Sequence, residues 1–272
     1  MNVLNRNINN VFFIFALSHL IVWTLVPSIT NNNLPLDTIE ALAWGSNLDW
    51  GFNKHPPMSA FFPEVFYKIF GAQDWAYYLL SQIFVLIAFY YVFKFANEIL
   101  GSISLALISI LLLTSIYFYN FTTPEFNVNV CQLPFWSMVV YYSWRIYDSK
   151  EIKLSDCLLV GIFAAIGFLS KYLFIYLLIS VDLLFVYLIF FKKTKKFDFK
   201  YLITLEVFLV LLVPHFIWLY DNEFITIFYG LKRTGLEESV IFDHIKYPLI
   251  FLLSLIHISE PTRLLSISYA VF

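Results

Sequence analysis

Long apolar runs separated by short polar breaks dominate the chain. Runs of about eighteen or more apolar residues are typical of helices that cross a lipid bilayer. We expect membrane spans at residues 11–28, 75–96, 103–119, 128–147, 157–170, 172–191, 201–219 and 247 onward. The pattern therefore predicts an all-α fold, a polytopic bundle of transmembrane helices.

One long apolar stretch holds both the fifth and the sixth expected spans. We expect the chain to reverse at Ser170-Lys171, a polar pair inside this stretch. If the chain does not reverse at this point, there is one span fewer and everything downstream lies on the opposite side of the membrane.

Composition supports a membrane protein. Hydrophobic residues make up 60% of the chain and charged residues 13%, whereas about a quarter of the residues in soluble domains are charged. The first apolar run lacks a small-residue cleavage site, so we expect it to be retained. The formal net charge of −2 gives no reason to expect a nucleic acid as a partner.

The C-terminal residues 253–272 resemble a translated adapter of the kind ligated to DNA in sequencing libraries. We therefore expect residues 253–272 to be a non-native tail and leave them out of the fold prediction. Residues 1–252 are then a transmembrane region, which we expect to be truncated because the natural gene would continue past codon 252.

Basic residues favour one orientation of the chain. If the N-terminus is cytoplasmic, the inner side holds Arg6, Lys94, Arg145, Lys150, Lys153, Lys192, Lys193, Lys195, Lys196 and Lys200. The outer side, with longer loops, holds Lys54, Lys68, Lys171, Lys232, Arg233 and Lys246. Since cytoplasmic loops are the basic ones, the loop after the first span and the loop at 221–246 are both expected outside.

The loop after the first span is unusually polar for this chain. Asp37, Glu40 and Trp44 are spaced i, i+3 and i+7, so a short helix would place them on one face. Pro35 suits the first turn of such a helix. Further on, Pro56-Pro57 predicts an extended corner, and residues 58–70 an amphipathic helix in the membrane interface.

These residue types suit group transfer from a lipid phosphate. The carboxylate of Asp37 could take a proton from an attacking hydroxyl. Positive charge from Lys54, His55 or Lys171 could stabilise the departing phosphate. The alternatives are that Asp37 and Glu40 are ordinary solvated loop residues and that Lys171 anchors the chain at the membrane interface.

The loop also carries a family resemblance. The string Leu36-Asp37-x-x-Glu40-Ala41-x-x-Trp44-Gly45, followed by Trp50-Gly51-Phe52-x-Lys54-His55-Pro56-Pro57-Met58, is similar to the first periplasmic loop of bacterial family 39-type glycosyltransferases. It looks most like the lipopolysaccharide-core galacturonosyltransferase branch, related to aminoarabinose and protein mannosyl transferases. Weaker matches follow at Thr123-Pro124-Glu125-Phe126-Asn127-Val128-Asn129, at 161–172 and at 214–224.

This resemblance implies the GT-C membrane fold and a polyprenyl-phosphate sugar donor. It implies inversion at the anomeric carbon and an extracytoplasmic acceptor such as lipid A, the lipopolysaccharide core or another cell-envelope glycan or protein. The protein would lie in a bacterial inner membrane with its active loop in the periplasm. The family's catalytic aspartate maps onto Asp37 and its second loop acid onto Glu40. The family often has adjacent acids, whereas Thr38 follows Asp37 here.

Further candidates are less specific. Trp44, Asn127 and Asn129 are candidate substrate-binding residues, although Asn127 could instead cap a helix. We predict no metal site and no cofactor, although a divalent cation could assist the leaving phosphate. Asp182 and Glu206, within spans, are expected to face the bundle interior.

The histidines and cysteines outside the loop receive structural interpretations. His19 is predicted to lie in the core or the interface. His215 and Trp218 are predicted to belong to an aromatic belt, with acceptor binding as the alternative. Cys131 and Cys157 are expected to be too far apart for a disulfide.

Two other functions remain open on the sequence alone. A multispan lipid or sugar transporter, or a flippase, would favour charged or broken segments at the membrane midplane and often internal repeats. A non-catalytic membrane scaffold would tolerate replacement of Asp37. The acidic cluster at one membrane face favours the enzyme.

Overall fold

The computed structural model describes residues 3–233 and 242–259. It divides into two compact units, Met1–Thr226 and Ile227–Phe272. The described residues form helices and connecting segments, with no strand among them. The all-α prediction is confirmed, and the helices are consistent with a membrane bundle.

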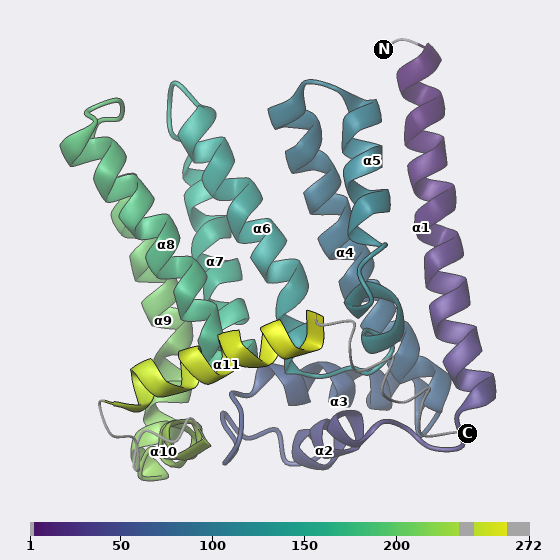
Figure 1. The fold of residues 1–272 in the computed structure, drawn as a ribbon. Helices are drawn as coiled ribbons and strands as arrows, with labels where there is room; N and C mark the ends of the chain where they lie inside the picture. The colour runs from purple at the N-terminus through teal and green to yellow at the C-terminus, as the bar shows by residue number, and fades with distance from the viewer. Residues whose placement is uncertain (1–2, 234–241, 260–272) are drawn as a thin grey trace. The chain divides into compact units, whose positions relative to one another are not determined.

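The helices of the first unit run in alternate directions (Figure 1). They are α1 (Val3–Thr30), α2 (Leu36–Gly45), α3 (Met58–Phe70), α4 (Asp74–Leu100), α5 (Ile103–Leu113), η1 (Phe118–Thr122), α6 (Val128–Asp148), α7 (Leu154–Ser170), η2 (Tyr172–Phe174), α8 (Ile175–Val186), η3 (Tyr187–Phe191) and α9 (Lys200–Asp221). Helix α10 (Ile225–Arg233) begins where this unit ends, and α11 (Asp243–Ser259) lies in the second unit.

Several of the expected spans are long and apolar enough to cross a bilayer. Among the described residues these segments are Ile8–Thr30, Asp74–Leu100, Tyr172–Phe191 and Lys200–Asp221. The predictions for 11–28, 75–96, 172–191 and 201–219 fall inside them. The spans predicted at 128–147 and 157–170 correspond to α6 and α7.

The predicted reversal at Ser170-Lys171 is confirmed. Helix α7 ends at Ser170, and Lys171 has an extended backbone with φ −161° and ψ 129°. Helices α7 and α8 then run in opposite directions (Figure 1). Because of this reversal, the loop after α1 and the loop after α9 meet at the same end of the bundle.

The span predicted at 103–119 is wrong in its length, because α5 ends at Leu113. Thr114 and Ser115 turn their hydroxyls back onto the carbonyls of Leu111 and Leu112, at 2.8 and 2.6 Å. The side-chain amide of Asn120 donates to the carbonyl of Thr114. Such side-chain bonds compete with the helical ladder. The chain therefore leaves the helix early and reaches Asn127 through a compact connection.

The prediction that Glu206 faces the bundle interior is also wrong, because Glu206 is exposed on the surface of α9. Asp182 is exposed as well, but it lines a pocket together with residues of α6, α7 and α9. A pattern of apolar and polar letters shows that a carboxylate lies in a span, but it does not show which side of the helix packs against protein.

The last expected span, 247 onward, lies within α11. Residues 253–259 continue that helix, and residues 260–272 lie outside the described residues. The proposed domain boundary at 253 and the origin of the tail stay predictions.

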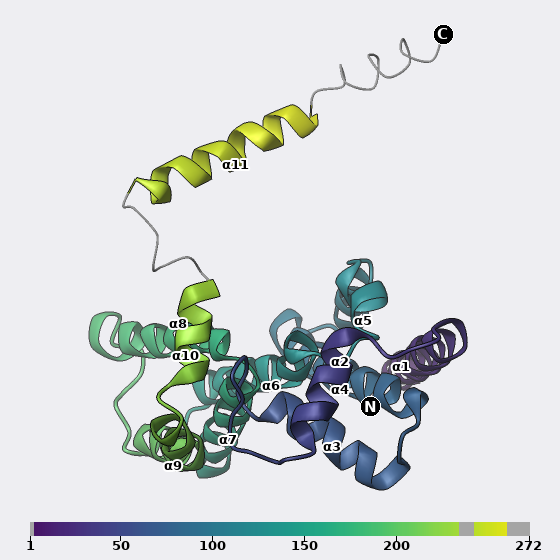
Figure 2. The ribbon, with the colours of Figure 1, turned by 90° about the horizontal axis from the view of Figure 1, so that it is seen from below.

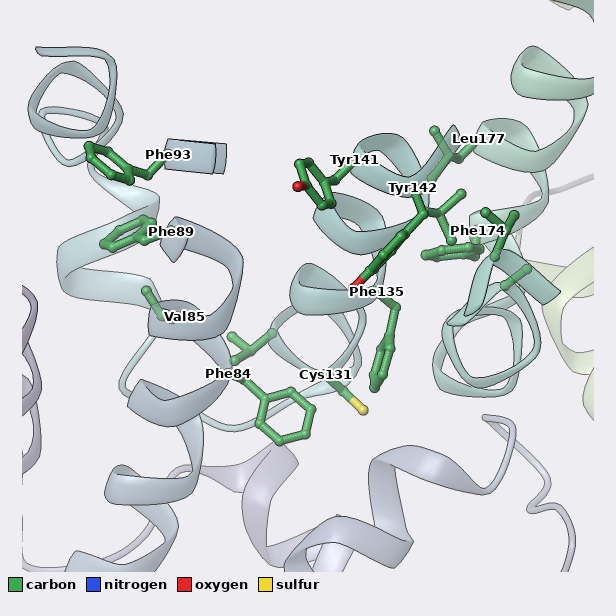
Figure 3. Packing of buried hydrophobic residues seen from close by; sticks show 14 of the residues in the cluster. Phe84, Val85, Phe89, Phe93, Cys131, Phe135, Tyr141, Tyr142, Phe174 and Leu177 are labelled. Atoms are coloured by element: carbon green, nitrogen blue, oxygen red, sulfur yellow. The ribbon is translucent and has the colours of Figure 1, made fainter. Parts of the chain in front are cut away.

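Aromatic side chains fill the centre of the first unit (Figure 3). The ring of Phe84 on α4 packs edge-on against Phe126, at 5.3 Å between centroids, and against Phe135 of α6, at 6.2 Å. Such pairs add to the stability gained by burying the rings. His19 is buried and packs against Phe89, 5.4 Å away, so its core assignment is confirmed. Cys131 and Cys157 are both free thiols.

Candidate functional site

Helices α2 and α3 form a platform at the end of the bundle where α4 and α6 begin (Figure 2). The two predicted helices are both present, and α2 starts directly after Pro35 with Asp37 in its first turn, where the helix dipole favours an acid. Gly45 lets the helices approach closely, since a Cβ there would lie 2.6 Å from the carbonyl oxygen of Ala60. Helix α3 also contacts α4, α6 and α7.

Most of the predicted site residues line one small pocket on this platform. Its lining comprises Asp37, Glu40, Ala41, Trp44, His55, Ser59, Asn127 and Val128. Asp37, Glu40 and Trp44 share a face of α2, as their spacing predicts. His55 comes from the segment before α3, and Asn127 from the start of α6. The pocket therefore joins three separate parts of the chain.

Lys54 is held at the edge of this pocket by Glu40. The Lys54 ammonium forms an ion pair with the Glu40 carboxylate, and both side chains are about one-third exposed. The ammonium also lies 5.9 Å from the centre of the Trp44 ring, and the His55 ring packs edge-on against Trp44 at 5.8 Å. Carboxylate, cation and aromatic surface thus adjoin one another.

Glu125 is a carboxylate of the motif at residues 123–129, and the sequence alone predicts no role for it. Its Oε1 accepts a hydrogen bond from the backbone N–H of Asp37 at 3.3 Å. Burial, and next the nearby Asp37 carboxylate, raise the pKa of Glu125. The two acids lie close together because residues 125 and 126 hydrogen-bond to α2. They are 88 residues apart in the chain, so no local sequence pattern predicts this contact.

The contacts of Thr38 explain why a threonine, and not a second acid, follows Asp37. Its side chain is buried, and its hydroxyl donates to the carbonyl oxygen of Phe126 at 3.1 Å. A carboxylate at this position would be buried against a carbonyl oxygen, an arrangement that is strongly unfavourable. The threonine instead fastens α2 to the segment that carries Glu125.

Lys171 and Asn129 form a second polar pair at the start of α6. The Lys171 ammonium donates to Asn129 Oδ1 at 2.5 Å. Asn127 caps the same helix, its Oδ1 accepting from the backbone N–H groups of Asn129 and Val130 at 2.9 and 3.2 Å. The capping alternative for Asn127 is therefore present in the structure, and its role in binding substrate stays a prediction.

His215 is wholly buried, so the prediction that it belongs to an aromatic belt is wrong. Its Nδ1 lies 2.5 Å from the carbonyl oxygen of Trp50, and its Nε2 lies 2.7 Å from the Tyr172 hydroxyl. Thr226 adds a bond from its hydroxyl to the carbonyl oxygen of Phe52 at 2.5 Å. These contacts fix the segment that precedes Lys54 to α9 and to the first turn of α10.

No group of three or more His, Cys, Asp or Glu side chains that could hold a metal ion occurs within the described part of the chain. The platform and the start of α6 offer carboxylates, lysines, an imidazole and an indole. Whether a divalent cation takes part stays a prediction.

Comparison with known proteins identifies the family. The model of the dolichyl-phosphate-mannose-protein mannosyltransferase family matches residues 54–218, more than half of the chain. No curated protein and no solved structure gives a significant match. The matched segment runs from Lys54 of the platform to the end of α9. It favours the enzyme over the transporter and the scaffold. The chain belongs to the dolichyl-phosphate-mannose-protein mannosyltransferase family and is a membrane glycosyltransferase of the GT-C type.

Proposed function

We propose that the protein transfers a sugar from a polyprenyl-phosphate donor to an extracytoplasmic acceptor, with inversion and with Asp37 as the general base. The acceptor is lipid A, the lipopolysaccharide core or another cell-envelope glycan or protein. The observation that carries the proposal is the pocket that gathers Asp37, Glu40, Trp44 and His55, with Lys54 ion-paired to Glu40 at its edge.

The proposed step is a single displacement. The acceptor hydroxyl attacks the anomeric carbon while Asp37 takes its proton. The bond between the anomeric carbon and the phosphate oxygen breaks, and its electron pair leaves with the polyprenyl phosphate. The step is balanced without a redox partner, and no cofactor is part of the proposal.

Lys54 supplies charge to the departing phosphate, and Glu40 positions Lys54. An ion pair this exposed to solvent contributes little to stability. Its proposed role is to hold the Lys54 ammonium beside the pocket. His55, packed against Trp44, is the second phosphate ligand, and the Trp44 ring offers an apolar face to the sugar. Lys171, bonded to Asn129, supplies a further cation for the phosphate.

The platform is proposed to face the periplasm of a bacterium whose inner membrane holds the protein, with the N-terminus in the cytoplasm. The excess of lysine and arginine at the opposite end of the bundle supports this orientation. The polyprenyl chain then stays in the bilayer while the sugar phosphate reaches the platform.

Sugar transfer in membranes that carry the protein tests the proposal. Radiolabelled galacturonic acid, aminoarabinose and mannose, each on undecaprenyl phosphate, are offered with a lipid A–core acceptor. Asp37→Asn is expected to lower transfer at least about a hundredfold. Asp49→Asn, which changes an exposed carboxylate of the same connecting segment, is the matched control and is expected to retain transfer.

Two results would overturn the proposal in different ways. Transfer that persists in Asp37→Asn, with normal membrane insertion, removes Asp37 from the role of base. Transfer that needs a nucleotide sugar instead of any undecaprenyl-phosphate sugar removes the proposed donor class while leaving the glycosyltransferase assignment in place.

A further inference from the structure

An apolar groove lies between α6 and α8 near the end of the bundle opposite the platform. Its volume is about 350 Å³, and aliphatic and aromatic side chains such as Leu184 and Phe185 form most of its wall. Ser143 of this groove is sixteen residues beyond Asn127 on α6, which at 1.5 Å per residue is about 24 Å along the helix. The groove is therefore separate from the candidate site.

Two polar side chains of this groove have no hydrogen-bond partner. The hydroxyl of Ser143 and the indole N–H of Trp144 are both buried and unpaired among the described residues. Ser143 is only 7% exposed. A buried donor without an acceptor costs about 1–3 kcal/mol. An acceptor brought by a bound molecule would remove this cost.

The end of the groove is positively charged. Lys192 lines it and forms no ion pair with any described residue, although its side chain is exposed. Lys195 lies 5.4 Å from the ring of Tyr147, another lining residue, and donates to the carbonyl oxygen of Ser149 at 2.9 Å. The apolar groove thus ends near the ammonium groups of Lys192 and Lys195, which lie in the segment between η3 and α9.

We propose that this groove binds an anionic glycerophospholipid. An acyl chain lies against Leu184 and Phe185, an ester carbonyl accepts from the Trp144 indole, and the phosphate lies beside Lys192. Anionic head groups are attracted to basic residues at the end of a span by about 1 kcal/mol per charge. The apolar wall favours a lipid over free inorganic phosphate.

The sugar donor does not fit this site. With its phosphate at Lys192, a polyprenyl-phosphate sugar would hold its anomeric carbon at the opposite end of α6 from Asp37. The lipid that we propose for this groove therefore takes no part in sugar transfer. Its binding can be tested independently of the proposed reaction.

Photocrosslinking tests the site. The protein is placed in nanodiscs that contain phosphatidylglycerol with a diazirine in one acyl chain, and the adducts are mapped by mass spectrometry. Adducts are expected on peptides that contain Trp144 or residues 181–192. Phosphatidylcholine with the same diazirine chain is expected to label these peptides at least threefold less.

Matched variants separate the groove from its surroundings. Trp144→Phe and Lys192→Gln are each expected to lower phosphatidylglycerol adducts at least threefold. The indole of Trp136, also on α6, donates to Gln132 Oε1 at 3.0 Å, so Trp136→Phe is expected to leave labelling unchanged. Lys153→Gln, at an exposed lysine outside the groove, controls for charge. Should Trp144→Phe misfold, the comparison of Lys192→Gln with Lys153→Gln decides.

Three outcomes would overturn the proposal. The first is equal labelling of the groove by the two phospholipids. The second is displacement of phosphatidylglycerol by an equimolar amount of undecaprenyl phosphate, which would make the groove a carrier-lipid site. The third is adducts that map to peptides outside the groove.

Discussion

The imidazole of His215 and the backbone carbonyl of Trp50 lie 2.5 Å apart, although 165 residues separate them in the chain. Because Nδ1 faces an acceptor, it carries the proton, and Nε2 is left to accept from the hydroxyl of Tyr172. A neutral histidine therefore makes two bonds at once. One of them fixes the segment that leads to Lys54 against α9.

Replacing His215 by alanine is expected to release this segment. The carbonyl of Trp50 and the hydroxyl of Tyr172 would each lose a partner, at a cost of about 1–3 kcal/mol per buried group. Thermal unfolding in detergent is expected to shift down by several degrees. Amide hydrogen exchange over residues 47–54 is expected to rise.

Tyr172→Phe is the control for this change. It removes the bond to Nε2 and the contact of the Tyr172 hydroxyl with the Thr226 side chain but leaves the bonds to the carbonyls of Trp50 and Phe52, so exchange over 47–54 is expected to stay near that of the unmodified protein. If His215→Ala also leaves the exchange unchanged, other contacts hold the segment and the histidine does not position it.

Gly51 permits the same segment to approach α9. A Cβ at this position would lie 2.3 Å from the nearest atom of the Trp218 ring. Gly51→Ala is therefore expected to destabilise the protein by about 1–3 kcal/mol through overpacking. A smaller side chain in a Gly51→Ala/Trp218→Leu double variant is expected to recover part of this loss, as measured by chemical or thermal unfolding.

Gly230 provides the comparison for a glycine without such a neighbour. Among the described residues, a Cβ at this helical position would meet no atom within 4 Å, and alanine is the better helix former by about 1 kcal/mol. Gly230→Ala is expected to be neutral or stabilising. An equal loss of stability in the two alanine variants would contradict the assignment of the Gly51 effect to the Trp218 ring.

The sequence predicts the helices of this protein better than their contacts. Apolar run length alone locates α1, α4, α8 with η3, and α9, because burying the backbone in lipid requires long helices. The i, i+3, i+7 spacing of Asp37, Glu40 and Trp44 correctly predicts one face of α2. The amphipathic pattern of residues 58–70 correctly predicts α3, whereas the extended corner expected at Pro56-Pro57 is not present at Pro57, whose backbone is helical with φ −74° and ψ −27°.

What the sequence does not reveal depends on side chains that meet across the fold. The early end of α5 follows from local bonds of Thr114 and Ser115 that apolar periodicity ignores. The surface position of Glu206, like the place of Asp182 at a pocket between helices, depends on which helices are neighbours. The partnership of Glu125 with Asp37, like that of His215 with Trp50, is a long-range contact without a sequence signature.

Lys54→Met tests the contribution of the Lys54 charge to catalysis separately from its contribution to the stability of the protein. The pair with Glu40 is partly exposed, so its loss is expected to change the free energy of unfolding by less than about 1 kcal/mol. Removing a cation that stabilises the leaving phosphate is expected to lower kcat about a hundredfold to a thousandfold. Steady-state sugar transfer, with unfolding measured on the same samples, distinguishes these effects.

Lys68→Met on α3 is the matched control. Lys68 is also a lysine of the platform, more exposed than Lys54, and its ammonium lies 3.6 Å from the Glu64 carboxylate. It lines no part of the pocket formed by Asp37 and Trp44. Comparable losses of kcat in both lysine variants would mean that general surface charge, and not Lys54 in particular, supports the transfer.

Glu125 is expected to make stability depend on pH in the direction opposite to a salt-bridged acid. Burial and the neighbouring Asp37 raise its pKa in the folded protein, so between the ordinary and the raised pKa the folded state binds more protons than the unfolded state. The free energy of unfolding then falls as pH rises through this interval. Glu125→Gln cannot ionise and is expected to be more stable than the unmodified protein at neutral pH.

The size of this effect is limited because Glu125 is only half-buried. Solvent screening keeps the gain of Glu125→Gln below about 1 kcal/mol, and the gain is expected to vanish as pH falls below the ordinary glutamate pKa of about 4.3. Thermal unfolding from pH 4 to pH 8 measures the difference. Glu151→Gln, at an exposed carboxylate far along the chain, is expected to show a difference that does not vary with pH. A Glu125→Gln difference that grows as pH falls would mean that the ionised carboxylate is stabilised in the folded protein, with the bond from the Asp37 amide outweighing burial and repulsion.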